Sequence, residues 1–144
     1  MFSTHPLVDA VRFKNLPKID SIIKSNPQII NTFDQKGHTA LHIACYLNST
    51  NIVSLLLRNG ADPLLTNPKT FSRNALHFAC SSGAFEVALL LIKKKIYHDL
   101  NQYDDRGYSP LHHAINKKNL FLVELLVQNG SKINISNSKQ VSRN

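Results

Sequence analysis

Histidine and cysteine side chains recur in this chain at positions that could hold a metal ion or supply a nucleophile. His42, His77 and His112 stand 35 residues apart, and Cys45 and Cys80 each follow a histidine by three residues. Zinc sites draw on closely spaced ligand pairs, such as two histidines four residues apart on one helix, and no such pair accompanies these residues. No acidic residue stands out to orient His42 beside Cys45, as a nucleophilic pair would need. The spacing therefore predicts no metal site, no cofactor site and no catalytic site.

The stretch around each histidine is copied along the chain. The tetrapeptide Leu-His-x-Ala at 41–44 returns at 76–79 and again at 111–114, and a weaker copy without the histidine lies at 7–10. Self-similarity at a fixed period of this length is typical of stacked-repeat architectures, in which each unit buries its apolar faces against the next. The histidines and cysteines then belong to the scaffold of the repeat.

Each copy carries apolar residues at helical spacing in two short runs with a break between them. Thr39 suits a helix N-cap and Pro110 suits the first helical position, while Gly37 suits a turn that needs a positive φ. The pattern therefore predicts two short helices in every copy. With their apolar positions, these helices are expected over residues 6–14, 19–23, 40–46, 52–57, 75–79, 87–92, 111–114 and 123–127.

Small alanines stand at the same place in every copy, at Ala10, Ala44, Ala79 and Ala114. They let the first helices approach one another closely, while the larger aliphatic residues of the second helices fill the seam between copies. Stacked helices lie about 8–10 Å apart, whereas a disulfide needs Cα atoms within roughly 7 Å. The two cysteines are therefore expected to be reduced and buried, which fits a reducing, cytoplasmic compartment.

The runs Thr39–Ala44, Leu55–Asp62 and Ser109–Ala114 resemble the ankyrin repeat, whose hallmark is a Thr-Pro-Leu-His-x-Ala box in a unit of about 33 residues. The resemblance implies an all-α repeat fold, an α-solenoid of four ankyrin repeats in which stacked helix-turn-helix pairs are linked by β-hairpin-like finger loops. It also implies that the box histidines hold turn and hairpin together through hydrogen bonds; these are His42, His77 and His112. The expected divisions are one domain at 1–135, repeats at about 3–33, 34–66, 67–103 and 104–135, and a polar tail at 136–144.

Two insertions interrupt the repeat pattern. The first lengthens the finger Thr66–Arg73, where Ser72 replaces the turn glycine and Asn74 replaces the box threonine. The second places Lys93–His98 where the family has a glycine-containing helix cap, and the first copy has Val8 in place of the histidine. Because the scaffold needs the matching positions, the positions that differ are the better guide to a partner.

The composition is that of an ordinary folded domain with a basic charge. Among 144 residues, 42% are hydrophobic and 18% charged, and Lys and Arg number 17 against 9 Asp and Glu, a formal charge of +8. No apolar run approaches the roughly 18 residues of a membrane span, and we expect no secretory signal peptide. The charge favours an anionic partner; the alternative is compositional drift in a chain rich in Asn, Lys and Ile.

The resemblance implies a non-enzymatic module that binds another protein through its concave groove and fingers, as a monomer without a small-molecule substrate. An acidic partner surface is expected from the charge. Exposed aromatic and arginine residues often dominate such interfaces. Carried over by match, the partner-binding positions are His38, Tyr46, Leu47, Thr70, Phe71, Arg73, Ser81, Ser82, Arg106, Tyr108, Asn116 and Lys117.

Several alternatives remain open at the level of sequence. Tyr46 and Leu47 could pack against the neighbouring finger instead of binding a partner. The lysines at 93–95 and 117–118 could be solvated charge, or they could support electrostatic binding of nucleic acid or an anionic membrane, which would weaken steeply with salt. Replacing Phe71 and Arg73 together is expected to abolish partner capture without lowering the melting temperature.

A narrower role follows from the resemblance and the Asn, Lys and Ile bias. Small stand-alone ankyrin proteins include cellular inhibitors and proteins that viruses or intracellular bacteria send into host cells. The chain is therefore expected in the cytoplasm, or in the host cytoplasm or nucleus if it is an effector of a pathogen. The identity of the partner is not written in the sequence.

Overall fold

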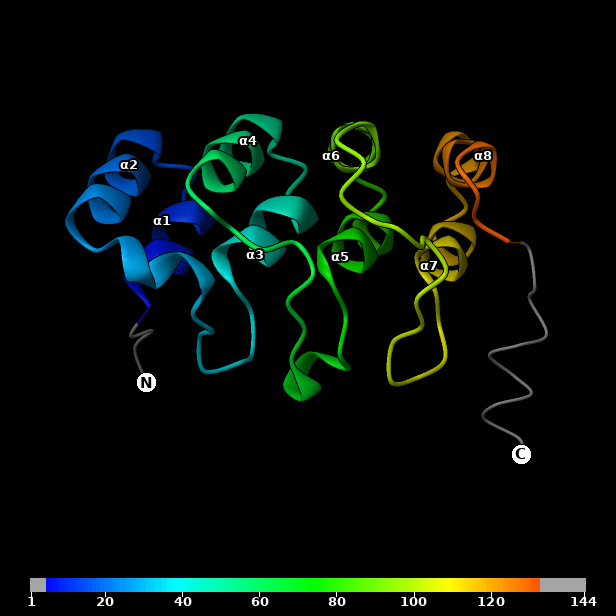
Figure 1. Ribbon diagram of the computed structural model, residues 1–144, viewed down its shortest axis with the longest axis horizontal. Helices are drawn as coiled ribbons and strands as arrows, with labels where there is room; N and C mark the ends of the chain where they lie inside the picture. The colour runs from blue at the N-terminus through cyan, green and yellow to red at the C-terminus, as the bar shows by residue number, and fades with distance from the viewer. Residues whose placement is uncertain (1–4, 133–144) are drawn as a thin grey trace.

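Eight α-helices form four consecutive pairs in the computed structural model, which describes residues 5–132 (Figure 1). Two short 3-10 helices, η1 and η2, add to them at Pro27–Asn31 and Pro68–Thr70. The pairs are α1 (Pro6–Arg12) with α2 (Leu16–Ser25), α3 (Ala40–Tyr46) with α4 (Thr50–Arg58), α5 (Ala75–Ser82) with α6 (Phe85–Lys93), and α7 (Pro110–Asn116) with α8 (Leu120–Gln128).

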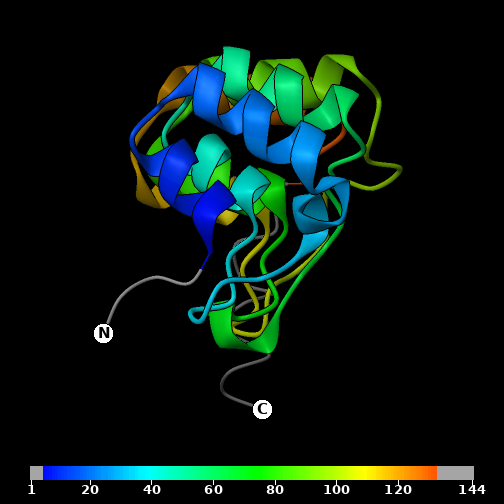
Figure 2. The same cartoon turned by 90° about the vertical axis from the view of Figure 1, so that its left-hand side faces the viewer.

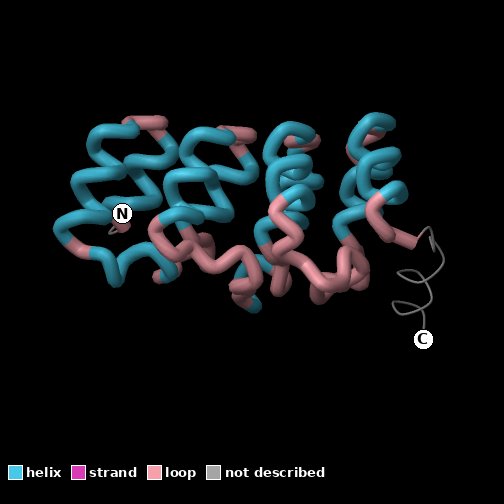
Figure 3. The backbone as a smooth tube through the Cα atoms, turned by 45° about the horizontal axis from the view of Figure 1, so that its top comes forward, coloured by secondary structure: helices cyan, strands magenta, loops and turns pink. Residues whose placement is uncertain are grey.

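The predicted all-α repeat fold is confirmed over the described part of the chain. Residues 5–132 contain no strand, and the loops that link the pairs are drawn without one (Figure 3). The expected domain boundary at 135 and the polar tail at 136–144 lie outside the described residues, as does the expected start of the first repeat at residue 3.

The helices lie in two layers. An inner layer of α1, α3, α5 and α7 runs side by side below an outer layer of α2, α4, α6 and α8 (Figure 1). Seen from the side, the long loops that precede α3, α5 and α7 extend away from both layers (Figure 2). Each inner helix packs on the next, so the core is one continuous seam through the stack.

The small size of the four alanines that the repeats share explains how closely the inner helices pack. Ala44, Ala79 and Ala114 are fully buried and Ala10 nearly so. Larger side chains from both layers, among them Leu41, Leu56, Leu76, Leu91 and Leu126, fill the space around them. Cys45 and Cys80 are free and buried, as predicted.

Local capping fixes where the inner helices begin. The side chains of Thr39, Asn74 and Ser109 each accept a hydrogen bond from the backbone N–H three residues on, as N-cap residues do. Asn74 therefore caps α5 in place of the threonine that the repeat pattern has there. Pro110 lies in the first turn of α7, as predicted.

The insertion after α6 supplies its own left-handed residue. Gly60 and Gly130 end α4 and α8 with φ of 94° and 105°, and Lys95 takes the corresponding place after α6 with φ of 53°. The side chain of Tyr97 turns inward, and its hydroxyl donates to the carbonyl oxygen of Pro63 at 3.2 Å. The inserted segment thus ties the second and third helix pairs together without a glycine cap.

Candidate partner-binding surface

Three loops project from the inner layer and are called fingers here. The first, second and third fingers precede α3, α5 and α7 and cover residues 32–39, 65–74 and 102–109. The first and third close with the same short turn: Asp34 N–H donates to His38 O, and Asp104 N–H donates to Tyr108 O, both at 2.8 Å. In both turns a carboxylate oxygen of the aspartate also accepts backbone N–H groups, so each turn is stabilised by contacts within its own finger.

The second finger is two residues longer than its neighbours and folds differently. Pro68–Thr70 form a turn of 3-10 helix, and Phe71 and Ser72 follow with left-handed φ values of 58° and 54°. Ser72 therefore adopts the conformation expected of the glycine it replaces. The strain of two consecutive left-handed residues needs support from the surroundings, which the third finger provides.

The fingers are bonded to one another at their tips. The Lys69 ammonium donates to Gln35 O at 3.1 Å, which links the second finger to the first. Asp105 N–H donates to Phe71 O at 2.7 Å and the Ser72 hydroxyl donates to the Asp105 carboxylate at 2.8 Å, which links the third finger to the second. The three tips consequently form one connected row.

The box histidines join each inner helix to the finger that follows it. Nδ1 of His42 accepts the Thr39 N–H, so Nε2 carries the proton and donates to Leu65 O at 3.1 Å. His77 makes the same pair of bonds, to Asn74 N–H and to Gln102 O at 3.0 Å. These are the hydrogen bonds that the resemblance implied. Burial lowers the pKa of both imidazoles to about 4.

His112 occupies the same place in the last pair. Its Nδ1 accepts the Ser109 N–H at 2.9 Å. Its ring also lies near the rings of Tyr103 and Tyr108, with centroids 6.1 and 6.0 Å away. The histidine therefore anchors the base of the third finger, next to Tyr108 of the candidate surface.

His5 performs this task in the first pair, and the sequence interpretation missed it. Its Nδ1 accepts the Val8 N–H at 3.1 Å, and its Nε2 lies 2.8 Å from the Thr32 hydroxyl and 3.2 Å from Thr32 O. Val8 holds the box position, but His5 stands at the N-cap, where Thr39 stands in the next copy. The signal was a histidine three residues before the expected one.

Asp34 and Asp104 point into the fingers and not toward solvent. The Asp104 carboxylate is fully buried and accepts from Arg73 Nε and His113 Nε2, both at 3.0 Å. Burial alone would raise the pKa of Asp104, but these donors and two backbone N–H groups outweigh it and hold the pKa far below its usual value. Asp34 is arranged similarly, with Arg12 at 3.8 Å, and its pKa is also lowered.

Arg73 therefore has a structural partner, which corrects one expectation from the sequence. Its side chain is only 23% exposed and its charge is paired with a buried carboxylate. Replacing it would leave Asp104 short of a donor and lower stability. The Phe71 and Arg73 double variant is thus no clean test of partner binding.

The basic residues at the finger tips are exposed. Lys36, Lys69 and Arg106 supply one cation to each finger. The Arg106 guanidinium carbon lies 4.1 Å from the centroid of the Phe71 ring, within cation–π range, and Phe71 remains 38% exposed. Tyr108 on the third finger is 40% exposed. The tips thus offer three cations beside two aromatic rings.

Two other predicted finger residues are less available. Thr70 is buried, and its hydroxyl donates to Asn67 O at 3.1 Å, so the expectation that it offers contact surface is wrong. The cause is the 3-10 turn, which tucks its last residue under the finger. His38 is half-buried against Phe78, with ring centroids 5.6 Å apart, and burial lowers the pKa of its imidazole.

The inner helices contribute a mixed set of predicted residues. Tyr46 is 52% exposed, whereas Leu47 is half-buried and packs against the core. The hydroxyls of Ser81 and Ser82 donate to carbonyl oxygens of their own helix. Asn116 and Lys117 are exposed at the end of α7.

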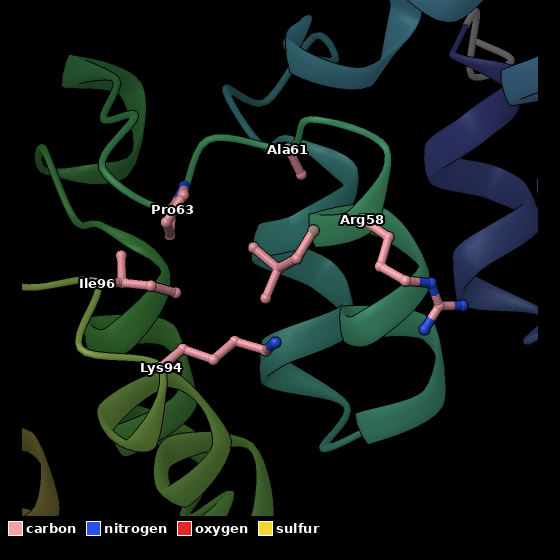
Figure 4. Close-up of a pocket in the computed structure, with 6 residues that line it drawn as sticks. Arg58, Ala61, Pro63, Lys94 and Ile96 are labelled. Atoms are coloured by element: carbon pink, nitrogen blue, oxygen red, sulfur yellow. The ribbon is translucent and has the colours of Figure 1, made fainter.

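Further apolar exposure lies away from the fingers, and that of Leu120 and Phe121 was not predicted. Leu120 and Phe121, at the start of α8, are 78% and 77% exposed, and Phe13 is 84% exposed. An open hollow of about 440 Å³ lies between α4 and the segment after α6, with Pro63 and Ile96 at its rim, and the Arg58 guanidinium points away from them (Figure 4). The hollow beside Leu120 and Phe121 is also lined by Ser82, Lys117 and Asn119, so it is a second candidate surface. The fingers are the better candidate because they place three exposed cations beside two aromatic rings.

Neither a metal cluster nor a membrane span is found among residues 5–132. No group of three or more His, Cys, Asp and Glu side chains there could bind a metal ion. The helices of that region are all too short to cross a bilayer.

Comparison with known proteins identifies the repeat. Residues 36–68 match the ankyrin repeat, and residues 60–137 match ankyrin repeats in three copies. Among similar proteins, the yeast (Saccharomyces cerevisiae) protein named "Probable 26S proteasome regulatory subunit p28" is 29% identical over 92% of this chain. The mouse B-cell lymphoma 3 protein homolog is 33% identical over 70% of the chain, and an ankyrin repeat protein of fowlpox virus is 28% identical over 96% of it.

These similar proteins are longer than the region they share with this chain. The aligned region spans 59% of the yeast protein, 30% of the viral protein and 23% of the mouse protein. The similarity therefore concerns the repeats that they have in common.

Proposed function

Because the chain belongs to the ankyrin-repeat family, whose repeats are protein–protein interaction modules, we propose that it binds an acidic surface of a partner protein. The finger row and the exposed residues of the inner helices form the contact. We assign no reaction to the chain. The hydrogen-bonded box histidines and the buried cysteines stabilise the repeat fold.

The observation that carries this proposal is the separation of charge within the fingers. The acids Asp34 and Asp104 are turned inward and satisfied by the fingers' own donors, with side chains 9% and 0% exposed. The cations Lys36, Lys69 and Arg106 are exposed at the tips. One further acid, Asp105, is exposed on the third finger, so the fingers carry three exposed cations against one exposed acid. This excess of positive charge favours an acidic partner and speeds its encounter.

The test replaces the three tip cations together. Lys36→Gln, Lys69→Gln and Arg106→Gln remove three charges from exposed positions. They break only the Lys69–Gln35 hydrogen bond and the stacking of Arg106 on Phe71, so the fold should survive. Proteins captured from cytosol by the wild type are quantified, and those specific to the finger row should fall at least tenfold with this variant. The melting temperature confirms that the variant is folded.

A matched control removes the same charge elsewhere. Lys18→Gln, Lys93→Gln and Lys132→Gln also change exposed side chains, none of them on a finger. Partners of the finger row should still bind this variant. If both triple variants lose the same partners equally, capture depends on net charge and the finger assignment is wrong.

Electrostatic binding of nucleic acid or an anionic membrane is the competing function, and salt distinguishes it. A protein that neutralises many phosphates loses affinity steeply as salt rises. Duplex RNA or phosphatidylserine vesicles are tested as ligands over a range of salt concentrations. If they bind more tightly than any captured protein, lose affinity steeply as salt rises, and are weakened alike by both triple variants, this alternative is favoured.

The narrower role as an inhibitor or host-directed effector and the cytoplasmic location belong to the same proposal. Similarity to a fowlpox virus ankyrin protein over 96% of the chain supports the first, and two buried free cysteines support the second. Fractionation of cells that produce the tagged chain, followed by capture of its partners, tests both. Partners found only outside the cytoplasm and nucleus would contradict them.

A further inference from the structure

The links between the two helices of each pair, with the helix residues beside them, form a surface called the turn edge here. The links are residues 13–15, 47–49, 83–84 and 117–119. Each finger leads into the start of an inner helix and each link follows its end, so the turn edge lies at the other end of the inner helices (Figure 2). Neighbouring links are bonded: the Asn48 side chain accepts the Val87 N–H at 3.1 Å, and the Asn119 amide donates to Gly83 O at 3.3 Å.

Every link turns at one residue with a left-handed backbone. In the second and third links this residue is Asn48 or Gly83, the types that adopt this conformation most readily. In the first and fourth links it is a lysine, and φ is 54° at Lys14 and 61° at Lys118. Strained residues of this kind gather at functional sites. The two end links thus carry a lysine at the cost of backbone strain.

Large apolar side chains protrude beside both of these lysines. Phe13 directly precedes Lys14, and Leu120 and Phe121 follow Lys118. All three apolar side chains are more than three-quarters exposed, which marks an interaction surface. An open hollow of about 460 Å³ lies beside the fourth link, lined by the apolar pair and by both lysines of that link.

Positive charge exceeds negative charge on the turn edge. The exposed acids are Glu86, whose carboxylate accepts from the Asn48 side chain at 2.7 Å, and Glu124, one turn into α8. Asp9, beside Phe13, is half-buried. The exposed cations of the first and fourth links and their flanks are Lys14, Lys18, Lys117 and Lys118.

A bilayer with anionic headgroups matches this combination of groups. Phenylalanine and leucine side chains enter the boundary between headgroups and acyl chains, while lysines beside them meet the headgroup phosphates. The apolar residues stand in the first and last helix pairs, at the two ends of the stack (Figure 1). A membrane surface can contact both ends at once, whereas a protein partner would need two separate pockets for them.

We propose that the turn edge docks on an anionic membrane surface. Phe13, Leu120 and Phe121 insert at the headgroup boundary, and the lysines of the first and fourth links bind headgroups. The contact uses none of the finger residues, so it adds a membrane site to the proposed protein binding and leaves the finger row available.

Flotation of the full chain with phosphatidylserine-containing vesicles tests the charge. The turn variant combines Lys14→Asn, Lys117→Gln and Lys118→Asn; asparagine suits the left-handed backbone at positions 14 and 118, as Asn48 does in the second link, so the fold should survive. The matched control replaces Lys36, Lys69 and Arg106 by Gln and removes the same charge from the fingers. Binding should fall at least tenfold in the turn variant and stay near wild type in the control. Equal losses would show dependence on net charge alone and overturn the assignment.

Insertion is tested without a change of charge. Phe13→Ser with Phe121→Ser alters two exposed side chains and should also weaken vesicle binding at least tenfold, with the melting temperature retained. Wild-type binding by this variant, or equal wild-type affinity for pure phosphatidylcholine vesicles, would overturn the proposal. So would a chain that binds no vesicles but loses captured proteins in the turn variant, since the edge would then hold an acidic protein. Capture of proteins lost only in the finger variant reports separately on the proposed function.

Discussion

Arg73 and Arg106 are neighbours on the Phe71 ring but should behave differently when replaced. Arg73 bonds the buried Asp104 carboxylate, so Arg73→Ala is expected to lower the free energy of unfolding by about 1–3 kcal/mol. Arg106 is exposed and loses only its stacking on Phe71, about 0.5–1 kcal/mol. Urea denaturation of both variants measures the difference. Equal losses would mean that the Arg73 pair adds nothing beyond stacking.

The buried histidines make stability depend on pH. The pKa of His42 and of His77 is about 4 in the folded chain, against 6.5 for an ordinary imidazole, because both rings are buried. Between these values the unfolded chain holds more protons, so the free energy of unfolding falls as pH drops from 6.5 to 4. The loss reaches about 3 kcal/mol for each ring at the lower limit.

Denaturation at several pH values checks this slope, with the double variant His42→Gln and His77→Gln as control. The variant should be less stable at neutral pH, but its stability should change much less between pH 6.5 and 4. A wild-type stability that stays flat over this interval would contradict the assigned protonation of the two rings.

At the level of single residues, some roles could be predicted from the sequence and others could not. The scaffold role of His42 and His77 could be read from the repeat because their bonds are part of every copy. The burial of Thr70 and the pairing of Arg73 could not, because both depend on a turn found in one finger and on a contact with Asp104, 31 residues away.

At the scale of elements, the fingers should depend on one another. A Cβ added at Gly37 would lie 2.8 Å from Cβ of Lys69, and φ there is +87°. Gly37→Ala is therefore expected to combine the left-handed penalty of about 1–2 kcal/mol with a clash worth about 1–3 kcal/mol more. Gly60, with φ of +94° and no atom within 4 Å, is the matched control.

The stability difference between Gly37→Ala and Gly60→Ala isolates the contact between fingers. Thermal denaturation of both variants provides the measurement. A Gly37 variant as stable as the Gly60 variant would show that the first and second fingers are not held together in solution.

The helices were the most predictable elements. Their apolar spacing and caps are local signals, so the starts at Ala40, Ala75 and Pro110 follow from the N-cap residues before them. The 3-10 turn at Pro68–Thr70 and the inward turn of Tyr97 lie in the insertions, for which the repeat offers no template. The shape of the second finger therefore had to come from the structure.

At the scale of the whole molecule, the basic charge is less informative than its placement. The formal charge of +8 is compatible with an acidic protein, nucleic acid or compositional drift. The structure hides Asp34 and Asp104, leaves Asp105 exposed, and places one exposed cation on each finger tip. The competing surface is apolar and lies at the start of α8, around Leu120 and Phe121.

Amide chemical-shift mapping with an oligoglutamate peptide tests the central claim most directly, because it shows which of these surfaces is used. We expect the largest changes within residues 34–38, 67–73 and 104–108, with amides of the outer helices α2, α4, α6 and α8 unmoved. Changes centred on Leu120 and Phe121, or spread evenly over all exposed lysines, would contradict binding by the finger row.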